Sequence, residues 1–389
     1  MIKKVVYLVG SPFSERDFNR FGIAILIKEG YDVEVWDYSS FLQPALIGIV
    51  TPLDFNQFSN LKKFTSKVQA ITALSELGKN VFIISILSYN SMTIGIFKAI
   101  SKNSIPYSVL GHFFSIFENE EIKTNKMKKL ISITPKKIMR QLRYLPARLP
   151  YAIFGIKSAT YVFMGGSLTK ITVPMVDEET KKVHIHSFDY DLYLKESNDG
   201  PSANESIVFL DQNIPFNTDP LPLGDKRLTT SQEYFPSLCK FFDKIEAKTG
   251  EKVVIAAHPR SYYEDKTYLF QGRKIVRGNT SQLVKDSKFV ITHYTTAINM
   301  AVLYNKPILF ITTNAIEKSF RQKAIDTLAD YFNQRVINID RKTDTDVEKD
   351  IMVNEQIYNQ FKNDFIKILG TPELPFWKVV SNHIYSLAS

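Results

Sequence analysis

The first half of the chain alternates short apolar runs with segments whose apolar residues recur at helical spacing. Residues 4–9 form a short, nearly unbroken apolar run, which predicts a strand. In the next segment Phe18, Phe21 and Ile25 recur every three or four residues, which predicts a helix over 17–29. The pattern continues with predicted strands at 32–36, 80–86 and 107–110 and predicted helices over 61–77 and 93–102. This alternation predicts a parallel sheet with right-handed crossovers.

The second half repeats this rhythm after a polar break. Residues 196–205 are rich in turn-forming residues and show no periodicity, so we interpret 198–205 as an interdomain linker. Beyond it the pattern predicts strands at 206–210, 252–256 and 307–311 and helices over 231–248, 318–332 and 347–369. The sequence therefore predicts an α/β protein with two Rossmann-like domains facing across a cleft, one over 1–197 and one over 206–389.

Two predicted strands of the second half end in polar clusters. One apolar run leads directly into His258, Pro259 and Arg260, and another is followed by Thr295 and Thr296 before a helical pattern begins. Because ligands of open α/β sheets bind outside the carboxyl ends of the strands, both clusters are expected at one crevice. A hydroxyl pair at a helix start, where N–H groups point outward, favours an anion. The sequence therefore predicts a nucleotide-phosphate site.

The sequence around His258 favours a fixed ring at the strand end. Pro259 biases the preceding backbone toward an extended conformation. The imidazole can then donate to a phosphate oxygen, and Arg260 can add positive charge. A strand-end histidine bonded to a neighbouring carbonyl is the alternative interpretation of this dipeptide.

Several other chemistries lack their sequence patterns. No G-x-G-x-x-G follows the first strand, and neither a Walker A sequence nor a G-x-S-x-G turn occurs. His184 and His186 share one face of a strand without an evident third ligand, so no metal site is predicted. The single cysteine, Cys239, lies in a helical pattern beside phenylalanines and is expected to be a packed, inert thiol. We expect no metal and no cofactor.

Composition places the chain among ordinary globular proteins with one unusual segment. In 389 residues the apolar fraction is 44%, no apolar run is long enough to span a bilayer, and no signal-peptide core follows Met1, which predicts a cytosolic protein. The formal charge is +9, and residues 122–150 contain nine Lys or Arg and no acidic residue, interleaved with apolar residues. Such a segment fits an anionic membrane surface, or equally a solvated face of a core-packing helix. No nucleic-acid-binding signature is present.

The two polar clusters also carry a family resemblance. The run HPR at 258–260, together with VITHYTTAINMAVLYNKPILFIT at 290–312, resembles the paired HP and Ser/Thr motifs of bacterial sialyltransferases and related surface-polysaccharide transferases. It is similar, more loosely, to motifs of teichoic-acid glycerophosphotransferases. The resemblance covers about 206–313 and implies a GT-B fold that binds a cytidine-linked donor in its C-terminal domain.

The resemblance also implies roles for individual residues. His258 would contact the phosphate and assist departure of the nucleotide, and Thr295 and Thr296 would bind the same phosphate. Neighbouring positions of the donor site would be Pro259, Arg260, Gly278, Asn279 and Thr280, the last three near the base or ribose.

Two departures from the family pattern leave the general base open. His293 stands where the glycerophosphotransferase motif has aspartate, and the acidic motif that supplies the base in many sialyltransferases is absent. Candidates are carboxylates expected in loops that face the cleft, with Glu15 ranked first and Asp17 second, the latter equally interpretable as a helix N-terminal carboxylate. Further candidates are Asp189, Asp191 and Asp211.

Together these features predict a metal-independent glycosyltransferase that moves a nonulosonic acid of the sialic, legionaminic or pseudaminic type from a CMP-activated donor to a surface-glycan acceptor, as in lipopolysaccharide or capsule synthesis. The basic segment would hold it at the inner membrane face. The alternatives are a phosphotransferase that uses a CDP-polyol and a non-catalytic module that binds nucleotide sugars.

Overall fold

The computed structural model describes residues 1–48, 50, 52–54, 57–111, 142–171, 173–196, 206–216, 227–263, 265–319, 321–341 and 351–387. These residues form two compact units. The first unit contains the described residues up to Gly111, those from 142 to Phe188 and those from Lys367 onward. The second contains the described residues from Asp189 to Ile366. Each unit is a Rossmann-like domain built on a parallel sheet, as the sequence predicts.

The first sheet has the strand order β3-β2-β1-β4-β5-β6-β7, and every pairing in it is parallel. The strands are β1 (Lys4–Val9), β2 (Asp32–Asp37), β3 (Leu61–Lys63), β4 (Val81–Ser85), β5 (Tyr107–Leu110), β6 (Tyr161–Met164) and β7 (Lys181–His184). The chain runs outward from β1 to β3 and then returns to the other side of β1. The switch point of this sheet therefore lies between β1 and β4.

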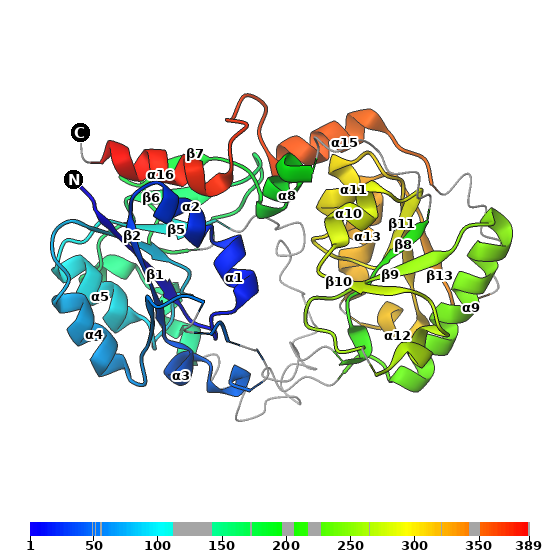
Figure 1. The fold of residues 1–389 in the computed structure, drawn as a ribbon, viewed down its shortest axis with the longest axis horizontal. Coiled ribbons are helices and arrows are strands. Elements are labelled where there is room, and N and C mark those ends of the chain that lie inside the picture. Colours follow the sequence, from blue (N-terminus) through cyan, green and yellow to red (C-terminus); the bar gives the residue numbers. More distant parts are fainter. Residues whose placement is uncertain are drawn as a thin grey trace. The chain divides into compact units, whose positions relative to one another are not determined.

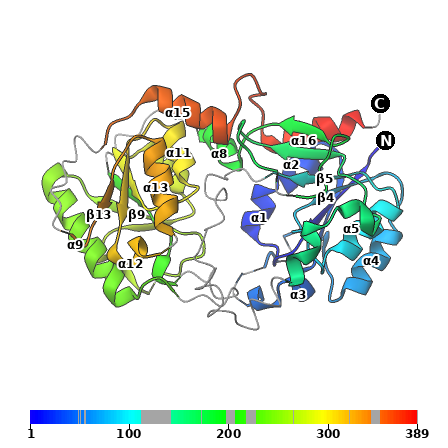
Figure 2. The same cartoon turned by 180° about the vertical axis from the view of Figure 1, so that it is seen from behind.

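Helices cover both faces of this sheet because its central strands are apolar on both faces. Val6 and Leu8 of β1 pack toward α4 (Lys67–Ser75) and α5 (Ile94–Lys102), while Val5 and Tyr7 pack toward α2 (Ile23–Lys28) and α16 (Phe376–Ser386). Figures 1 and 2 show the blue strand β1 between these two helix layers. The C-terminal helix α16 thus belongs to the same layer as a helix near the N-terminus.

The second sheet has the strand order β10-β9-β8-β11-β12-β13 and is also parallel. The strands are β8 (Ile207–Leu210), β9 (Val253–Ala257), β10 (Ile275–Arg277), β11 (Phe289–Thr292), β12 (Ile308–Thr312) and β13 (Val336–Asn338). Its switch point lies between β8 and β11. Figures 1 and 2 show α9 (Ser231–Thr249) on one side of this sheet and α10 (Thr280–Lys285), α11 (Ile298–Leu303) and α13 (Arg321–Tyr331) on the other.

Two predicted helices are divided in the structure. The segment over 17–29 forms α1 (Glu15–Arg20) and α2, separated at Gly22, whose φ of +53° departs from helical geometry. The carbonyls that end α1 accept hydrogen bonds from side chains, since Trp377 Nε1 donates to Arg20 O and Tyr7 Oη donates to Phe21 O. The segment over 61–77 begins as strand β3, and α4 starts only after Ser66, whose hydroxyl accepts from Gln69 N. Over 347–369 the described helical part is α15 (Glu355–Phe361), which continues as a π-helical turn to Ile366.

The chain passes between the units at a different place from the expected linker. The boundary lies at Phe188 and Asp189, at the start of α8 (Phe188–Glu196), while 198–205 lie outside the described residues. Phe188 packs on Phe376 and Trp377 in the first unit, whereas Tyr190 belongs to the core of the second. The prediction that the C-terminal domain covers 206–389 is also wrong at its end, because the residues from Lys367 onward belong to the first unit.

Candidate functional site

The polar clusters lie along the carboxyl edge of the second sheet. β8 pairs with β9 on one side and with β11 on the other, and β10 lies beyond β9. Because all these strands are parallel, His258 after β9, Thr295 after β11 and Gly278 after β10 share one edge. The structure therefore brings the predicted donor-site residues of this unit to a common edge.

Backbone hydrogen bonds fix the His258 loop. The His258 N–H donates to Asp211 Oδ2 at 3.2 Å, and its carbonyl accepts from Ser261 N at 2.8 Å and Ser261 Oγ at 2.7 Å. The ring Nδ1 accepts from Arg260 N at 3.1 Å. Since Nδ1 accepts, the neutral ring carries its proton on Nε2, where it can donate to an oxygen. Pro259 and Arg260 are exposed beside it.

The end of β8 ties the two clusters together, and sequence reasoning missed this role. Asp211 is buried, and besides His258 N it accepts from Asn213 N at 2.9 Å and Tyr263 Oη at 3.0 Å. Gln212 Oε1 accepts from Tyr294 N at 3.0 Å, next to the hydroxyl pair. Burial raises the pKa of Asp211, opposed by these donors. Asp211, one of the candidate bases from the sequence, instead holds together its own loop after β8 and the His258 loop. The only sequence signal for this role was a run of polar residues directly after a buried strand.

The hydroxyl pair lies just ahead of α11. Thr295 Oγ1 accepts from Ala297 N at 3.2 Å, and the carbonyls of Thr295 and Thr296 accept from Ile298 N and Asn299 N. Thr296 is exposed and Thr295 is half-buried. The bond from Ala297 N holds Thr295 Oγ1 in place, and its hydroxyl hydrogen stays free to rotate and donate to an anion.

His293 is a buried structural residue rather than a ligand-binding one. Its Nδ1 bonds to Ile311 O at 2.8 Å and its Nε2 to Tyr234 Oη at 2.9 Å. Burial lowers the pKa of His293 to about 4. The ring is therefore neutral, with Nδ1–H donating to the carbonyl and Nε2 accepting from the tyrosine. The glycerophosphotransferase motif has a charged aspartate where this chain has the neutral His293.

Gly278, Asn279 and Thr280 form the connection from β10 to α10. Gly278 has a φ of +83°, Asn279 precedes the helix, and Thr280 begins it. Gly278 and Asn279 are exposed and Thr280 is half-buried. The left-handed turn at Gly278 leaves backbone open at the same edge as His258, which suits close approach of a ligand.

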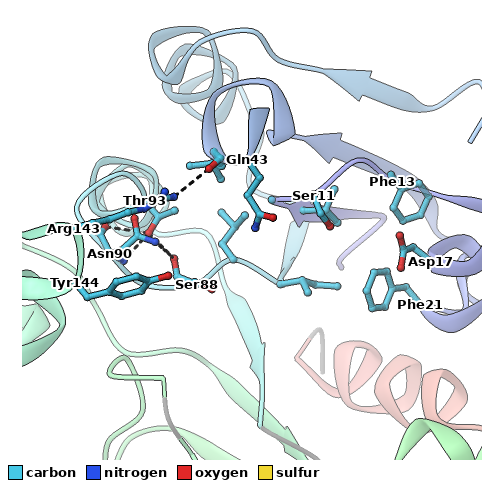
Figure 3. A pocket seen from close by; sticks show the side chains of 15 residues that line it. Ser11, Phe13, Asp17, Phe21, Gln43, Ser88, Asn90, Thr93, Arg143 and Tyr144 are labelled. Carbon is cyan, nitrogen blue, oxygen red and sulfur yellow. Dashed lines mark hydrogen bonds between the residues drawn. The ribbon is translucent and has the colours of Figure 1, made fainter. Parts of the chain in front are cut away.

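A pocket of about 110 Å³ lies at the switch point of the first unit. Its floor is formed where β1 ends at Val9 and by Ile86 to Ser88, which follow β4. Figure 3 shows the side chains around it. The residues of its lining with polar side-chain groups are Ser11, Asp17, Gln43, Ser88, Asn90, Thr93, Arg143 and Tyr144.

The two carboxylates proposed from the sequence differ in their relation to this pocket. Asp17 lines it and also closes a capping box, because Asp17 Oδ2 accepts from Ser14 Oγ at 2.7 Å and Ser14 N at 3.2 Å. Glu15 is exposed in the first turn of α1 and is not part of the lining. Asp189 lies in the second unit, where its carboxylate accepts from Asn299 Nδ2 at 2.8 Å.

Within the part of the chain that the structure describes, no group of three or more His, Cys, Asp or Glu side chains is arranged to hold a metal ion. Among the same residues, no helix combines the length and apolarity needed to cross a membrane. Most of the basic segment, residues 122–141, lies outside the described residues.

Comparison with known proteins supports the fold. No protein-family model and no curated protein matches the sequence. Among solved structures, the teichoic acid polymerase TagF (H548A) matches with a TM-score of 0.55 and 10% identity, over 99% of this chain and 89% of that one. The calicheamicin glycosyltransferase CalG4 matches with a TM-score of 0.52 and 10% identity, over 99% of this chain and 98% of that one. The chain therefore has the fold of GT-B glycosyltransferases.

Proposed function

We propose that this protein is a glycosyltransferase that binds a nucleotide-activated sugar at the carboxyl edge of the second unit and an acceptor in the pocket of the first. The observation that carries the proposal is the edge where Asp211 and Gln212 tie the His258 loop to the hydroxyl pair. This edge presents an imidazole N–H after β9 and two threonine hydroxyls after β11, the two strands that flank β8. The GT-B fold supports the same function.

The edge is suited to stabilising a departing nucleotide. When the glycosidic bond to the donor phosphate breaks, negative charge grows on the phosphate oxygen. The Nε2–H of His258 and the hydroxyl of Thr295, both on side chains held by backbone hydrogen bonds, and the exposed hydroxyl of Thr296 are donors that can meet this charge without a metal ion. Arg260, exposed in the same loop, adds positive charge.

The donor that we propose is a CMP-activated nonulosonic acid, on the basis of the HPR run and the segment over 290–312. Gly278, Asn279 and Thr280 follow β10, which is separated from β11 by β9 and β8, and would then face the base or ribose. The likeness to TagF favours a second candidate, a phosphotransferase that uses a CDP-polyol.

Asp17 is the better candidate for the base that removes the acceptor proton. It is the single carboxylate among the described residues that line the pocket, whereas Glu15 lies outside the lining. Its Oδ2 is held by Ser14, which orients the carboxylate. We therefore rank Asp17 above Glu15.

Membrane docking by the segment over 122–150 remains part of the proposal. Its described end exposes apolar side chains, with Leu142 at 60%, Leu145 at 49% and Leu149 at 45%, alongside the exposed Arg148. Apolar insertion combined with basic charge is the pattern of an interfacial segment, here at the cytosolic face. Co-sedimentation with anionic vesicles should weaken at high salt and in a variant with Lys128, Lys129, Lys136 and Lys137 changed to Gln. Binding to neutral vesicles that matches binding to anionic ones would contradict it.

A donor panel tests the function. CMP-nonulosonic acids, UDP-sugars and CDP-glycerol are incubated with and without glycan acceptors, and release of the nucleotide is followed. Acceptor-dependent release of CMP supports the proposal, and release from CDP-glycerol supports the second candidate. Binding of the nucleotide without turnover of any donor would identify a non-catalytic module.

A further inference from the structure

We propose that the pocket of the first unit recognises a carboxylate on a sugar, and that Arg143 is the residue that binds it. The inference rests on the proposed function and names the class of substrate that this pocket takes. Arg143 escapes notice in the sequence because it is one of nine basic residues between 122 and 150.

Backbone contacts hold Arg143 at the pocket. Its Nη2 donates to Leu42 O at 3.2 Å, at the end of α3 (Ser39–Leu42), and its own carbonyl accepts from Ser91 N at 2.9 Å. Its Nε is buried and has no hydrogen-bond partner among the described residues. A buried donor without an acceptor is unfavourable, and an anion that enters the pocket would relieve it.

Hydrogen bonds within the loop that carries Ser91 fix its conformation. Asn90 and Thr93 are buried, Asn90 N donates to Thr93 Oγ1 at 3.0 Å, and Thr93 Oγ1 donates to Ser88 O at 2.7 Å. Asn90 Oδ1 accepts from Met92 N at 2.9 Å. These two side chains therefore shape the loop, and Ser91 in that loop holds the backbone of Arg143 through its carbonyl.

The charges of the lining indicate what kind of anion fits. Arg143 and Asp17 are the charged residues among those that line the pocket, and Figure 3 shows them at opposite ends, with Gln43 and Ser11 between. One cation balanced by one carboxylate favours a monoanion over a dianionic phosphate monoester. A planar carboxylate also matches the guanidinium. Gln43 and Ser11 supply the amide and hydroxyl groups that sugar hydroxyls need.

The carboxylate could belong to the acceptor or to the donor sugar, because uronic acids and nonulosonic acids share this group. Binding experiments establish the chemistry, and kinetics distinguish the source. Arg143→Gln should raise the KM for the acceptor alone if the acceptor carries the carboxylate, and the KM for the donor alone if the donor does. A KM unchanged for both substrates overturns the proposal.

The binding test uses glucuronate, glucose and glucose 6-phosphate with the full chain, followed by ligand-observed NMR titration. Native protein should prefer glucuronate, and Arg143→Gln should weaken that binding by about tenfold or more. Arg143→Lys, which keeps the charge but loses the planar fork, should fall between them. Asp17→Asn should tighten glucuronate binding by about twofold, because it removes a repelling charge.

Arg148→Gln is the matched control, since it removes an exposed basic side chain from the same segment and should leave the titration unchanged. Thermal unfolding verifies that each variant is folded. If Arg143→Gln does not fold, the comparison of native protein with Arg143→Lys still tests the proposal. Equal binding of glucose and glucuronate, or tighter binding of glucose 6-phosphate, overturns the proposal. Nucleotide binding, measured separately, reports on the second unit, so failure of the pocket and failure of the proposed function give different results.

Discussion

The carboxyl edges of the two sheets share one device, a buried aspartate that bonds to the loop after a neighbouring strand, and differ in the chemistry around it. In the first unit Asp37 ends β2 and accepts from Ser39 N at 2.8 Å and from Phe13 N, in the loop after β1, at 3.1 Å. In the second, Asp211 follows β8 and accepts in the same way from Asn213 N and from His258 N after β9. Both carboxylates are buried.

The side chains that the two sheet edges present are different. The first edge places a carboxylate and a guanidinium, Asp17 and Arg143, around one pocket. The second presents His258 and two threonine hydroxyls. Buried aspartates thus shape both edges, while other residues at each edge decide whether it carries opposite charges or hydrogen-bond donors.

The largest effect is expected at the pocket of the first unit. If Asp17 removes the acceptor proton, Asp17→Asn should lower turnover by roughly 10²–10⁴-fold. Glu15→Gln, on the exposed side of the same helix turn, should keep turnover. The measurement is initial rate at saturating donor, with nucleotide binding as a control. A loss in Glu15→Gln with normal turnover in Asp17→Asn would transfer the role of base to Glu15.

The second edge should respond almost as strongly. His258→Ala should depress turnover by about 10²–10³-fold, the scale of losing one preorganised donor. His184→Ala, in β7 of the first unit, is the matched control. Near-native turnover in a folded His258→Ala protein would mean that this edge does not stabilise the departing nucleotide.

Acid should destabilise the second unit through His293. Its pKa is about 4 in the folded state, below the unfolded value of about 6.5, so the unfolded state binds the proton first. The contribution of the neutral His293 ring to the free energy of unfolding is fully present above about pH 6.5. It is lost as the pH falls toward 4, and the total loss is about 3 kcal/mol. Urea unfolding followed across this range in native protein and in His293→Gln measures it. Identical pH profiles for the two proteins would contradict the assignment.

Two glycines with positive φ should differ in their tolerance of a methyl group. At Gly22 a Cβ would lie 2.2 Å from Trp377 Cδ1, whereas at Gly250, with a φ of +74°, nothing lies within 4 Å. Gly22→Ala should cost about 2–3 kcal/mol through strain and overpacking. Gly250→Ala should cost about 1–2 kcal/mol through strain alone. Chemical denaturation of both variants tests the order, and equal losses would refute it.

The sequence predicts those features that depend on strand order and not those that depend on loop contacts. His258 and Thr295 could be assigned to one edge because parallel strands place their carboxyl ends together. Asp211 and Gln212 bond to backbone N–H groups whose positions depend on the loop conformation. Arg143 gains its place from a carbonyl some hundred residues earlier, at Leu42.

Helix boundaries show the same limit. The periodicity over 17–29 continues through Gly22, and the break there depends on Trp377, near the other end of the chain. The sequence pattern also gave no signal that residues from Lys367 onward rejoin the first unit, because an apolar helix can pack equally well on either sheet.

The return of α16 to the first unit sets an order on biosynthesis. Trp377 and Phe376 complete a core that contains Tyr7, Phe21 and Phe188, so the first unit keeps an aromatic face uncovered until α16 has left the ribosome. The described residues of the second unit run without return from Asp189 to Ile366, so all of them emerge before α16 does. A ribosome that stops before Phe376 would therefore release a chain with one finished half and one that exposes its core, a ready target for chaperones and proteases.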